Sequence, residues 1–430
     1  MSLRNKTITG VKWTSVSTIT LAVVGLVKIS VLARYLDASD FGLMALVTFV
    51  LGFMNLFMDM GLTSAILHKQ NISDNEYASL YWINVIFSLI LFGLISLGSP
   101  YIAGFYKESE LTILIPLMAI SIMLSAFGRQ FKTIEQKDLN FKYIAATDIL
   151  GAAFGLVIGV LLAIWGYGVY ALVYAALTQY AISNLIYFVK GFIDRGMFFH
   201  FNYDETKPFI MIGIYQVGGQ VVNYFNRDLD ILLIGKFFGS EILGGYSLAK
   251  QLVQKPMQIL NPIITKVASP VLSLLQSDRV KLKDKFLSFL NIVATANFTA
   301  YGLLAILAYP VVLLLYGNDF THIVILVQIL SAYMFIRSVA SPVGSLVVAT
   351  GRTDLEFYWN FYVLLIIPIS IYIGSLYSIT VVASNLSITM LLLLAPFWKL
   401  LIQKLCGADF KEFILNVLPN YKATFNKIIK

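Results

Sequence analysis

The chain of 430 residues carries little charge, because only 13% of its residues are Asp, Glu, Lys or Arg. Soluble proteins hold about 25% of such residues. In contrast, 58% of the residues are hydrophobic and the mean hydropathy is +0.80. A soluble core cannot absorb so much apolar sequence. The composition therefore predicts a polytopic membrane protein, built entirely from α-helices that satisfy their own backbone hydrogen bonds within the bilayer.

Residues that build metal, redox and catalytic sites are also scarce. The single cysteine, Cys406, permits no internal disulfide. The three histidines, His68, His200 and His322, lie far apart and have no metal-ligand spacing. No phosphate-binding loop, zinc motif, catalytic triad or paired-carboxylate pattern occurs. We therefore expect no cofactor, no metal ion and no catalytic residues, and a protein that is not an enzyme.

Apolar stretches long enough to cross a bilayer, about 20 residues each, recur along the chain. They predict twelve membrane helices, at 11–33, 41–66, 79–98, 111–128, 143–165, 168–190, 208–235, 242–272, 287–315, 322–348, 357–376 and 378–402.

Basic residues predict how these helices are oriented. With the N-terminus inside, twenty-two Lys and Arg residues fall in the inner segments, whereas the outer segments hold only Arg34, Lys107 and Lys236. Basic residues accumulate in cytoplasmic loops. Both termini should therefore be cytoplasmic. The basic residues lie in short loops between apolar spans, which is not the pattern of a nucleic-acid-binding surface, so no nucleic acid partner is expected.

The second half of the chain resembles the first half. Three pairs of stretches match in the same order, with offsets of 202, 210 and 216: residues 33–42 with 235–244, 100–106 with 310–316, and 138–141 with 354–357. Each repeat holds six spans, an even number, so the halves share one orientation as parallel repeats. We expect two six-helix lobes around a central cavity.

The predicted domains follow from this repeat. They are a first lobe at 1–190, a cytoplasmic linker at 191–207, a second lobe at 208–403 and a basic cytoplasmic tail at 404–430. Two interpretations of the tail are open. Apolar residues between 410 and 418 could form one face of a helix at the membrane surface, or the tail could be solvated.

A polar stripe lies within the seventh span. Its members are spaced 4, 3, 4 and 3 residues apart and cover about 21 Å of one helix face: Gln216, Gln220, Asn223, Arg227 and Asp230. Charges at membrane depth usually face a bundle interior or a wet cavity. Subtracting the repeat offset of 202 from Asp230 gives Lys28, so the first span should present a related face to the same cavity.

These residues, with two further cations, are the candidate site. We expect Lys28, Arg227, Arg337 and Lys250, with Gln216, Gln220 and Asn223, to line a substrate-binding cavity, because Arg suits phosphate groups. The alternative is that each cation pairs with a nearby acid or reaches the interface. Asp230, Asp228 and Asp59 are candidates for coupling transport to protons or sodium, or else they form structural ion pairs.

Several stretches resemble one transporter family. They are Leu80-Tyr81-Trp82-Ile83-Asn84-Val85, Arg129-Gln130-Phe131, Asn261-Pro262-Ile263-Ile264-Thr265, and Arg337-Ser338-Val339 followed by Pro342. The sequence resembles the Wzx-type polysaccharide (O-antigen) flippases of the colanic-acid-exporter kind, within the multidrug/oligosaccharidyl-lipid/polysaccharide (MOP) exporter superfamily.

That resemblance implies a substrate and a mechanism. An undecaprenyl-diphosphate-linked oligosaccharide repeat unit, used for lipopolysaccharide O-antigen or exopolysaccharide, would cross the inner (plasma) membrane of a bacterium by alternating access. Many members carry two further C-terminal helices, and twelve are expected here, so a lipid-tail groove built from those helices is not implied. A monomer is expected because the cavity forms within one chain, and a polysaccharide polymerase is a candidate partner in the membrane.

Two other functions compete with this interpretation. A cation-coupled small-molecule (drug) exporter of the same superfamily would have a small apolar cavity and an essential acid. An integral-membrane polymerase or glycosyltransferase would need a large outer loop with catalytic residues. The outer loops, at 34–40, 100–110, 165–168 and 316–321, are too short for that.

Overall fold

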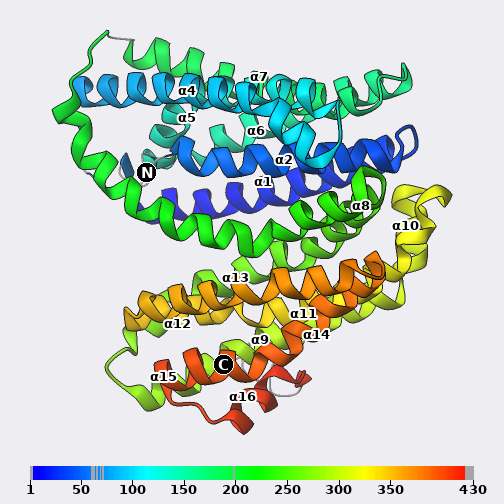
Figure 1. The fold of residues 1–430 in the computed structure, drawn as a ribbon. Coiled ribbons are helices and arrows are strands. Elements are labelled where there is room, and N and C mark those ends of the chain that lie inside the picture. Colours follow the sequence, from blue (N-terminus) through cyan, green and yellow to red (C-terminus); the bar gives the residue numbers. More distant parts are fainter. Residues whose placement is uncertain are drawn as a thin grey trace. The chain divides into compact units, whose positions relative to one another are not determined.

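The computed structural model describes residues 3–59, 63, 66–67, 69, 72–196 and 199–421 (Figure 1). Within these residues every regular element is a helix and none is a strand, which confirms the all-α prediction. Many large apolar side chains on these helices are exposed, for example Leu97 (76%) and Leu392 (70%). Such surfaces suit a hydrocarbon environment and not water. The chain divides into two compact units, residues 1–224 with 239–244, and residues 225–238 with 245–430.

The first unit is a bundle of long helices. They are α1 (Leu3–Leu32), α2 (Ala38–Asp59), α4 (Asp74–Tyr106), α5 (Leu111–Lys137), α6 (Phe141–Ile164) and α7 (Val169–Arg195). Helix α7 packs against both α5 and α6, α5 packs against α4, and α1 packs against α6. A capping box begins α4, in which the Ser73 hydroxyl accepts from the Glu76 N–H and the Glu76 carboxylate accepts from the Ser73 N–H.

Small residues let α6 and α7 approach each other closely. A Cβ added at Gly151 would lie 2.1 Å from the Ser183 hydroxyl, and one at Gly155 would lie 2.6 Å from the Ala175 carbonyl. Glycine spacing of this kind is a common basis of helix packing in membranes. The α6–α7 contact therefore depends on these glycines.

Helix α8 (Tyr203–Leu274) is two helices joined at a reversal. Its 72 residues are helical except at Gly239, where φ is +79° and ψ is −179°. Glycine adopts positive φ without steric cost. The two halves run side by side after the reversal, since Tyr246 donates a hydrogen bond to Asp230 and Lys250 donates one to the Arg227 carbonyl. They correspond to the predicted spans 208–235 and 242–272.

The second unit contains the remaining helices. They are α9 (Arg279–Ile306), α10 (Ala308–Tyr316), the 3-10 helix η1 (Asn318–Ile323), α11 (Val324–Val339), α12 (Ser341–Thr350), α13 (Thr353–Ser375), α14 (Ile379–Phe397), the π-helix η2 (Trp398–Ile402), α15 (Gln403–Cys406) and α16 (Phe410–Val417). Helix α11 packs against α9 and α14, and α14 packs against α13.

Two predicted spans are interrupted. The span predicted at 287–315 ends as α9 at Ile306 and continues as α10, and the span predicted at 322–348 is divided at Ala340. Pro342 lies at the start of α12, where its missing N–H would have no helical acceptor. Among the described residues, eleven helical stretches are long and apolar enough to cross a membrane. One of them, 217–274, contains the Gly239 reversal, so the described stretches account for the twelve predicted spans.

The internal repeat is visible in the structure. The α1–α2 hairpin turns at residues 33–37, and the α8 hairpin turns at Gly239, which is Asp37 shifted by 202. A Cβ at Gly42 would lie 1.8 Å from the Ser240 carbonyl oxygen, and one at Gly244 would lie 1.7 Å from the Ala38 carbonyl oxygen. The offset of 202 relates Gly42 to Gly244 and also relates Ala38 to Ser240. The two contacts are therefore equivalent.

The other two matched stretches behave differently. Tyr106 and Tyr316 are related by the offset of 210, and they are the buried last residues of α4 and α10. In both helices the next residue, Lys107 or Gly317, has a positive φ. Residues 138–140 form the loop before α6, which begins at Phe141, whereas 354–357 already lie within the first turns of α13. That third match therefore does not align equivalent turns.

Part of the tail forms a docked helix. In α16 the Phe413 side chain is fully buried and Val417 is nearly so, in a core shared with α9, α12 and the end of α14. The Asn291 amide donates to the Leu418 carbonyl (3.1 Å), and Lys283 bonds Glu412 (2.9 Å). The apolar face of α16 thus packs on the second unit. The domain boundaries at 190, 207 and 403 stay predictions, as does the cytoplasmic location of the tail.

Candidate functional site

A polar cavity of 750 Å³ opens in the second unit, between α8, α11 and α12. Its size falls within the range of about 300–1,000 Å³ typical of ligand sites. Amide, hydroxyl and guanidinium groups dominate its polar lining, which comprises Arg227, Gln254, Gln258, Asn261, Thr265, Ser269, Arg337, Ser341 and Ser345, with Asp228. Such groups can hydrogen-bond sugar hydroxyls and bind anions.

Arg337 contributes a positive charge to this cavity from the end of α11. It lies one helical turn after Tyr333, whose hydroxyl accepts a hydrogen bond from the guanidinium at 3.0 Å. The guanidinium carbon lies 6.0 Å from the centre of the same ring. Within the described part of the chain, no carboxylate lies within ion-pair distance of Arg337. Its guanidinium is therefore held in place by the Tyr333 side chain, and the carboxylates of Asp230 and Asp228 act on it only at a longer range than an ion pair.

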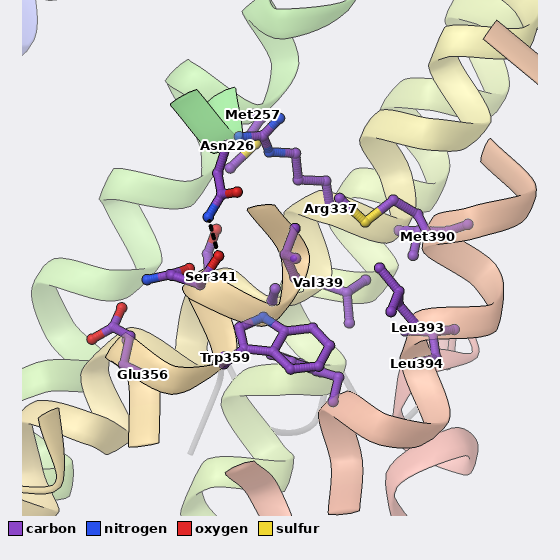
Figure 2. A pocket seen from close by; sticks show the side chains of 16 residues that line it. Asn226, Met257, Arg337, Val339, Ser341, Glu356, Trp359, Met390, Leu393 and Leu394 are labelled. Carbon is purple, nitrogen blue, oxygen red and sulfur yellow. Dashed lines mark hydrogen bonds between the residues drawn. The ribbon is translucent and has the colours of Figure 1, made fainter. Parts of the chain in front are cut away.

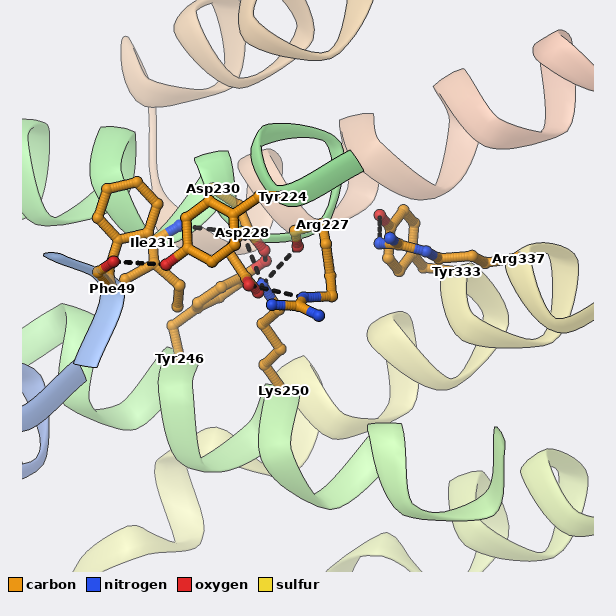
Figure 3. A network of polar contacts seen from close by, with 10 residues as sticks. All are labelled: Phe49, Tyr224, Arg227, Asp228, Asp230, Ile231, Tyr246, Lys250, Tyr333 and Arg337. Carbon is orange, nitrogen blue, oxygen red and sulfur yellow. Dashed lines mark hydrogen bonds and ion pairs between the residues drawn. The ribbon is translucent and has the colours of Figure 1, made fainter. Parts of the chain in front are cut away.

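An ionic cluster lies close to this cavity (Figure 3). Lys250, buried to 7% exposure, contacts Asp230 at 2.6 Å and Asp228 at 3.1 Å. Asp228 also accepts from the Arg227 Nε at 2.7 Å, and Tyr246 donates to Asp230 at 2.6 Å. Buried charges are usually paired in this way. The two acids and two bases of the cluster cancel, so Arg337 leaves this wall of the cavity with a net positive charge.

A hydrogen-bond network supports the break between α11 and α12. The Asn261 amide donates to the Ser338 carbonyl at 3.0 Å and to the Ser341 hydroxyl, and its side-chain carbonyl accepts from Asn297 at 2.8 Å. A further hydrogen bond of 2.8 Å joins Ser269 of α8 to Ser345 of α12. Residues just after a helix break carry backbone groups without helical partners. This network fixes the residues that carry Arg337 and Ser341.

The structure brings only some of the predicted residues together. Arg227 and Arg337 line the cavity, and so does Asp228. Lys250 and Asp230 lie in the ionic cluster beside it, and each is buried against its partners.

The other predicted residues are not part of this lining. Gln220 and Asn223 are exposed on α8, and Lys28 lies half-buried in α1 of the first unit. The side chains of Gln216 and Asp59 fall outside the described ones. The functional roles of all these residues stay predictions.

Four polar lining residues of α8 were missed by the sequence analysis, whereas Asn261-Pro262 was a candidate for a hinge or for a carbonyl in the cavity. The missed residues Gln254, Gln258, Thr265 and Ser269 lie with Asn261 on one face of the second half of α8, at spacings of 4, 3, 4 and 4 residues. The seventh span was recognised by the same periodicity. Because this stripe holds no charge, it was less conspicuous in an apolar helix. Within the described residues, no group of His, Cys, Asp or Glu could hold a metal ion.

Comparisons with known proteins agree with this architecture. The chain is 29% identical over 427 residues to the lipopolysaccharide biosynthesis protein WzxC of Escherichia coli K12, covering 98% of this chain and 86% of that protein. It is also 29% identical to the teichuronic acid biosynthesis protein TuaB of Bacillus subtilis 168, covering 96% and 87%.

A solved structure shares the fold. The lipid II flippase MurJ, in an inward closed conformation, has a TM-score of 0.77 at 16% identity, over 96% of this chain and 90% of that one. At this identity the likeness shows the fold alone. A family model described as polysaccharide biosynthesis protein matches residues 31–325. Since that match covers more than half of the chain, the protein belongs to this polysaccharide biosynthesis family.

Proposed function

We propose that this protein is a flippase that moves an undecaprenyl-diphosphate-linked oligosaccharide repeat unit across the bacterial inner membrane by alternating access. The observation that carries the proposal is the positive wall of the polar cavity. Arg337 lies there without an ion-pair partner in the described chain, among amide and hydroxyl groups. A sugar diphosphate needs both features, a cation for the phosphates and hydrogen-bonding groups for the sugar.

Each cavity residue has a proposed role. The Arg337 guanidinium binds the diphosphate through its planar fork of N–H donors. Arg227, whose side chain is 58% exposed although it contacts Asp228, supplies a second guanidinium. Gln254, Gln258 and Thr265 donate to and accept from sugar hydroxyls. A substrate-binding role for Lys28 stays a prediction.

The ionic cluster has a structural role in this proposal. Lys250 makes two ion pairs and bonds a backbone carbonyl, so its charge is satisfied within the protein. This arrangement supports the structural alternative for Asp228 and Asp230 over ion coupling. The names of the relatives favour a polysaccharide precursor over a drug as substrate. We further propose a monomer that acts in transport and not as an enzyme, with both termini in the cytoplasm.

Complementation tests the proposal. A strain lacking its own flippase receives the wild type, Arg337→Ala, Arg227→Ala or, as a matched control, Arg352→Ala. Arg352 is a half-exposed arginine that is paired with Asp354 and does not line the cavity. We expect wild type and Arg352→Ala to restore surface polysaccharide. Arg337→Ala should accumulate lipid-linked precursor at equal membrane abundance. Full function of Arg337→Ala would contradict the assignment of the cavity.

A further inference from the structure

A second cavity of 290 Å³ lies behind the first, between α13, α14 and the break that separates α11 from α12 (Figure 2). Its wall is mainly apolar. Trp359 and Val363 come from α13, and Met390, Leu393, Leu394 and Phe397 come from α14. The polar cavity described above has a different chemistry, with amide and hydroxyl groups. Two adjacent cavities whose walls hold different residue types, amides and hydroxyls in one and mainly aliphatic and aromatic side chains in the other, suit a ligand with a polar part and an apolar part.

The two cavities share one boundary. Met257, Arg337, Ser341 and Gly344 line both of them. Gly344 belongs to α12, and a Cβ built on it would meet no atom within 4 Å. Open space therefore lies beside this glycine, at the point where the polar and apolar cavities meet.

The charge at this boundary is positive. Figure 2 shows the Arg337 side chain extending along one end of the apolar cavity, beside Asn226 and Met257. The acid that lines this cavity, Glu356, lies away from the Arg337 guanidinium in the same view. An anionic group held at Arg337 would thus have polar groups on one side and apolar side chains on the other. The sequence of polar groups, cation and apolar side chains matches an isoprenoid-diphosphate-linked sugar, in which the diphosphate lies between the sugar and the hydrocarbon.

We infer that the apolar cavity binds the first isoprene units of the lipid carrier, next to the diphosphate. This inference rests on the proposed function and adds a subsite to it. The volume of 290 Å³ lies at the lower limit of about 300–1,000 Å³ for ligand sites. A short segment of the chain fits there, and the remainder of a long polyprenyl chain extends into the bilayer. The cavity therefore recognises the α-end of the isoprenoid and not its length.

Binding of soluble analogues tests the subsite. The full chain, purified in detergent, is titrated by calorimetry with inorganic pyrophosphate, dimethylallyl diphosphate, geranyl diphosphate and farnesyl diphosphate. Each methylene group that is buried in an apolar cavity strengthens binding. We expect affinity to rise at least tenfold from pyrophosphate to geranyl diphosphate, and to rise much less from geranyl to farnesyl diphosphate, because the cavity is then filled.

Gly344→Leu is the decisive variant. The leucine side chain would occupy the open space between the cavities without meeting existing atoms at its Cβ. We expect Gly344→Leu to lose the gain in affinity that the isoprene units add over pyrophosphate, a ratio that is measured within each variant so that any change in pyrophosphate binding cancels. Gly302→Leu is the matched control, since Gly302 on α9 also has no atom within 4 Å of a built Cβ and lines neither cavity. Gly302→Leu should keep the full rise in affinity from pyrophosphate to geranyl diphosphate.

The outcomes separate the subsite from the flippase proposal. If wild type and Gly344→Leu show the same gain with chain length, the gain comes from partition into detergent and the subsite is refuted. If pyrophosphate binds through Arg337, as shown by weaker binding of Arg337→Ala, but chain length has no effect, the subsite fails and the diphosphate site stands. If Arg337→Ala binds pyrophosphate as tightly as wild type, the diphosphate site of the proposed function fails.

Discussion

Helices α2 and α8 are in close contact at Gly42 and Gly244, and this contact predicts how substitutions there change the stability of the protein. In Gly244→Ala the new Cβ would lie 1.7 Å from the Ala38 carbonyl oxygen, whereas Cβ contacts below 3.0 Å are essentially never seen. The α2 and α8 backbones would have to separate by about 1.3 Å, the difference between these two distances. Backbone atoms cannot rotate away as a side chain could. The strain therefore reaches the upper part of the range of about 1–3 kcal/mol for overpacked sites.

The expected magnitude includes an opposing contribution. Alanine favours helix by about 1 kcal/mol relative to glycine, so Gly244→Ala should destabilise by about 2 kcal/mol. Gly42→Ala should cost a similar amount, since its Cβ would lie 1.8 Å from the Ser240 carbonyl oxygen. The measurement is the midpoint of thermal unfolding in detergent, followed by tryptophan fluorescence. Gly302→Ala, with open space at its Cβ, is the control and should be neutral or slightly stabilising.

The double variant distinguishes this mechanism from a general loss of stability. Both glycines belong to one crossing, because the Cβ of Gly244 would also lie 3.0 Å from the Gly42 backbone nitrogen. Once one Cβ has separated the helices, the second should cost less. We therefore expect Gly42→Ala/Gly244→Ala to lose clearly less than the sum of the single variants, as neighbouring sites do. Single variants as stable as wild type, or strictly additive losses, would refute the reasoning.

Two further predictions concern charges. Lys250→Met should destabilise by about 3–5 kcal/mol, because it leaves the buried Asp230 carboxylate without its cation, while Lys250→Met/Asp230→Asn should recover much of that loss in the same thermal assay. The second concerns α16, where hydrogen bonds from the Asp409 backbone N–H and from Lys283 hold the pKa of Glu412 below its ordinary value. A carboxyl group whose pKa is lowered by folding stabilises the folded state at pH values above its unfolded-state pKa, and this stabilisation is lost as the pH falls through its folded-state pKa. Proteolysis of the 407–421 segment should therefore accelerate between neutral and acidic pH. Glu412→Gln should abolish that pH dependence.

Much of the fold could be predicted from the sequence, because the bilayer imposes strong local rules. Apolar runs must form helices of a fixed minimum length, so the spans were visible in composition alone. The offset of 202 between Gly42 and Gly244 also predicted the two equivalent hairpins. The breaks at Leu307 and Ala340 were not predicted, because apolar residues continue across them. The break at Ala340 has a tertiary partner, the Asn261 side chain, which donates to the Ser338 carbonyl and to the Ser341 hydroxyl.

The candidate site was less predictable than the fold. Arg227 and Arg337 were recognised because a charge in an apolar span is conspicuous. Lys250 has the same sequence signal, yet it is neutralised by acids that lie 20 and 22 residues away in the chain. Only the α8 reversal brings these residues together. Sequence identifies a cation at membrane depth, but its counter-ions depend on which helix faces it.

The docking of α16 has a consequence for the timing of biosynthesis. Phe413 completes a core whose other members include Phe286 of α9 and Leu346 of α12, which a ribosome makes long before it. The earlier helices can enter the membrane one after another during translation. The second unit nevertheless cannot close this core until residue 417 has emerged. Its final packing is thus a late event, in which a nascent chain exposes an unfilled groove along α9 to chaperones and proteases.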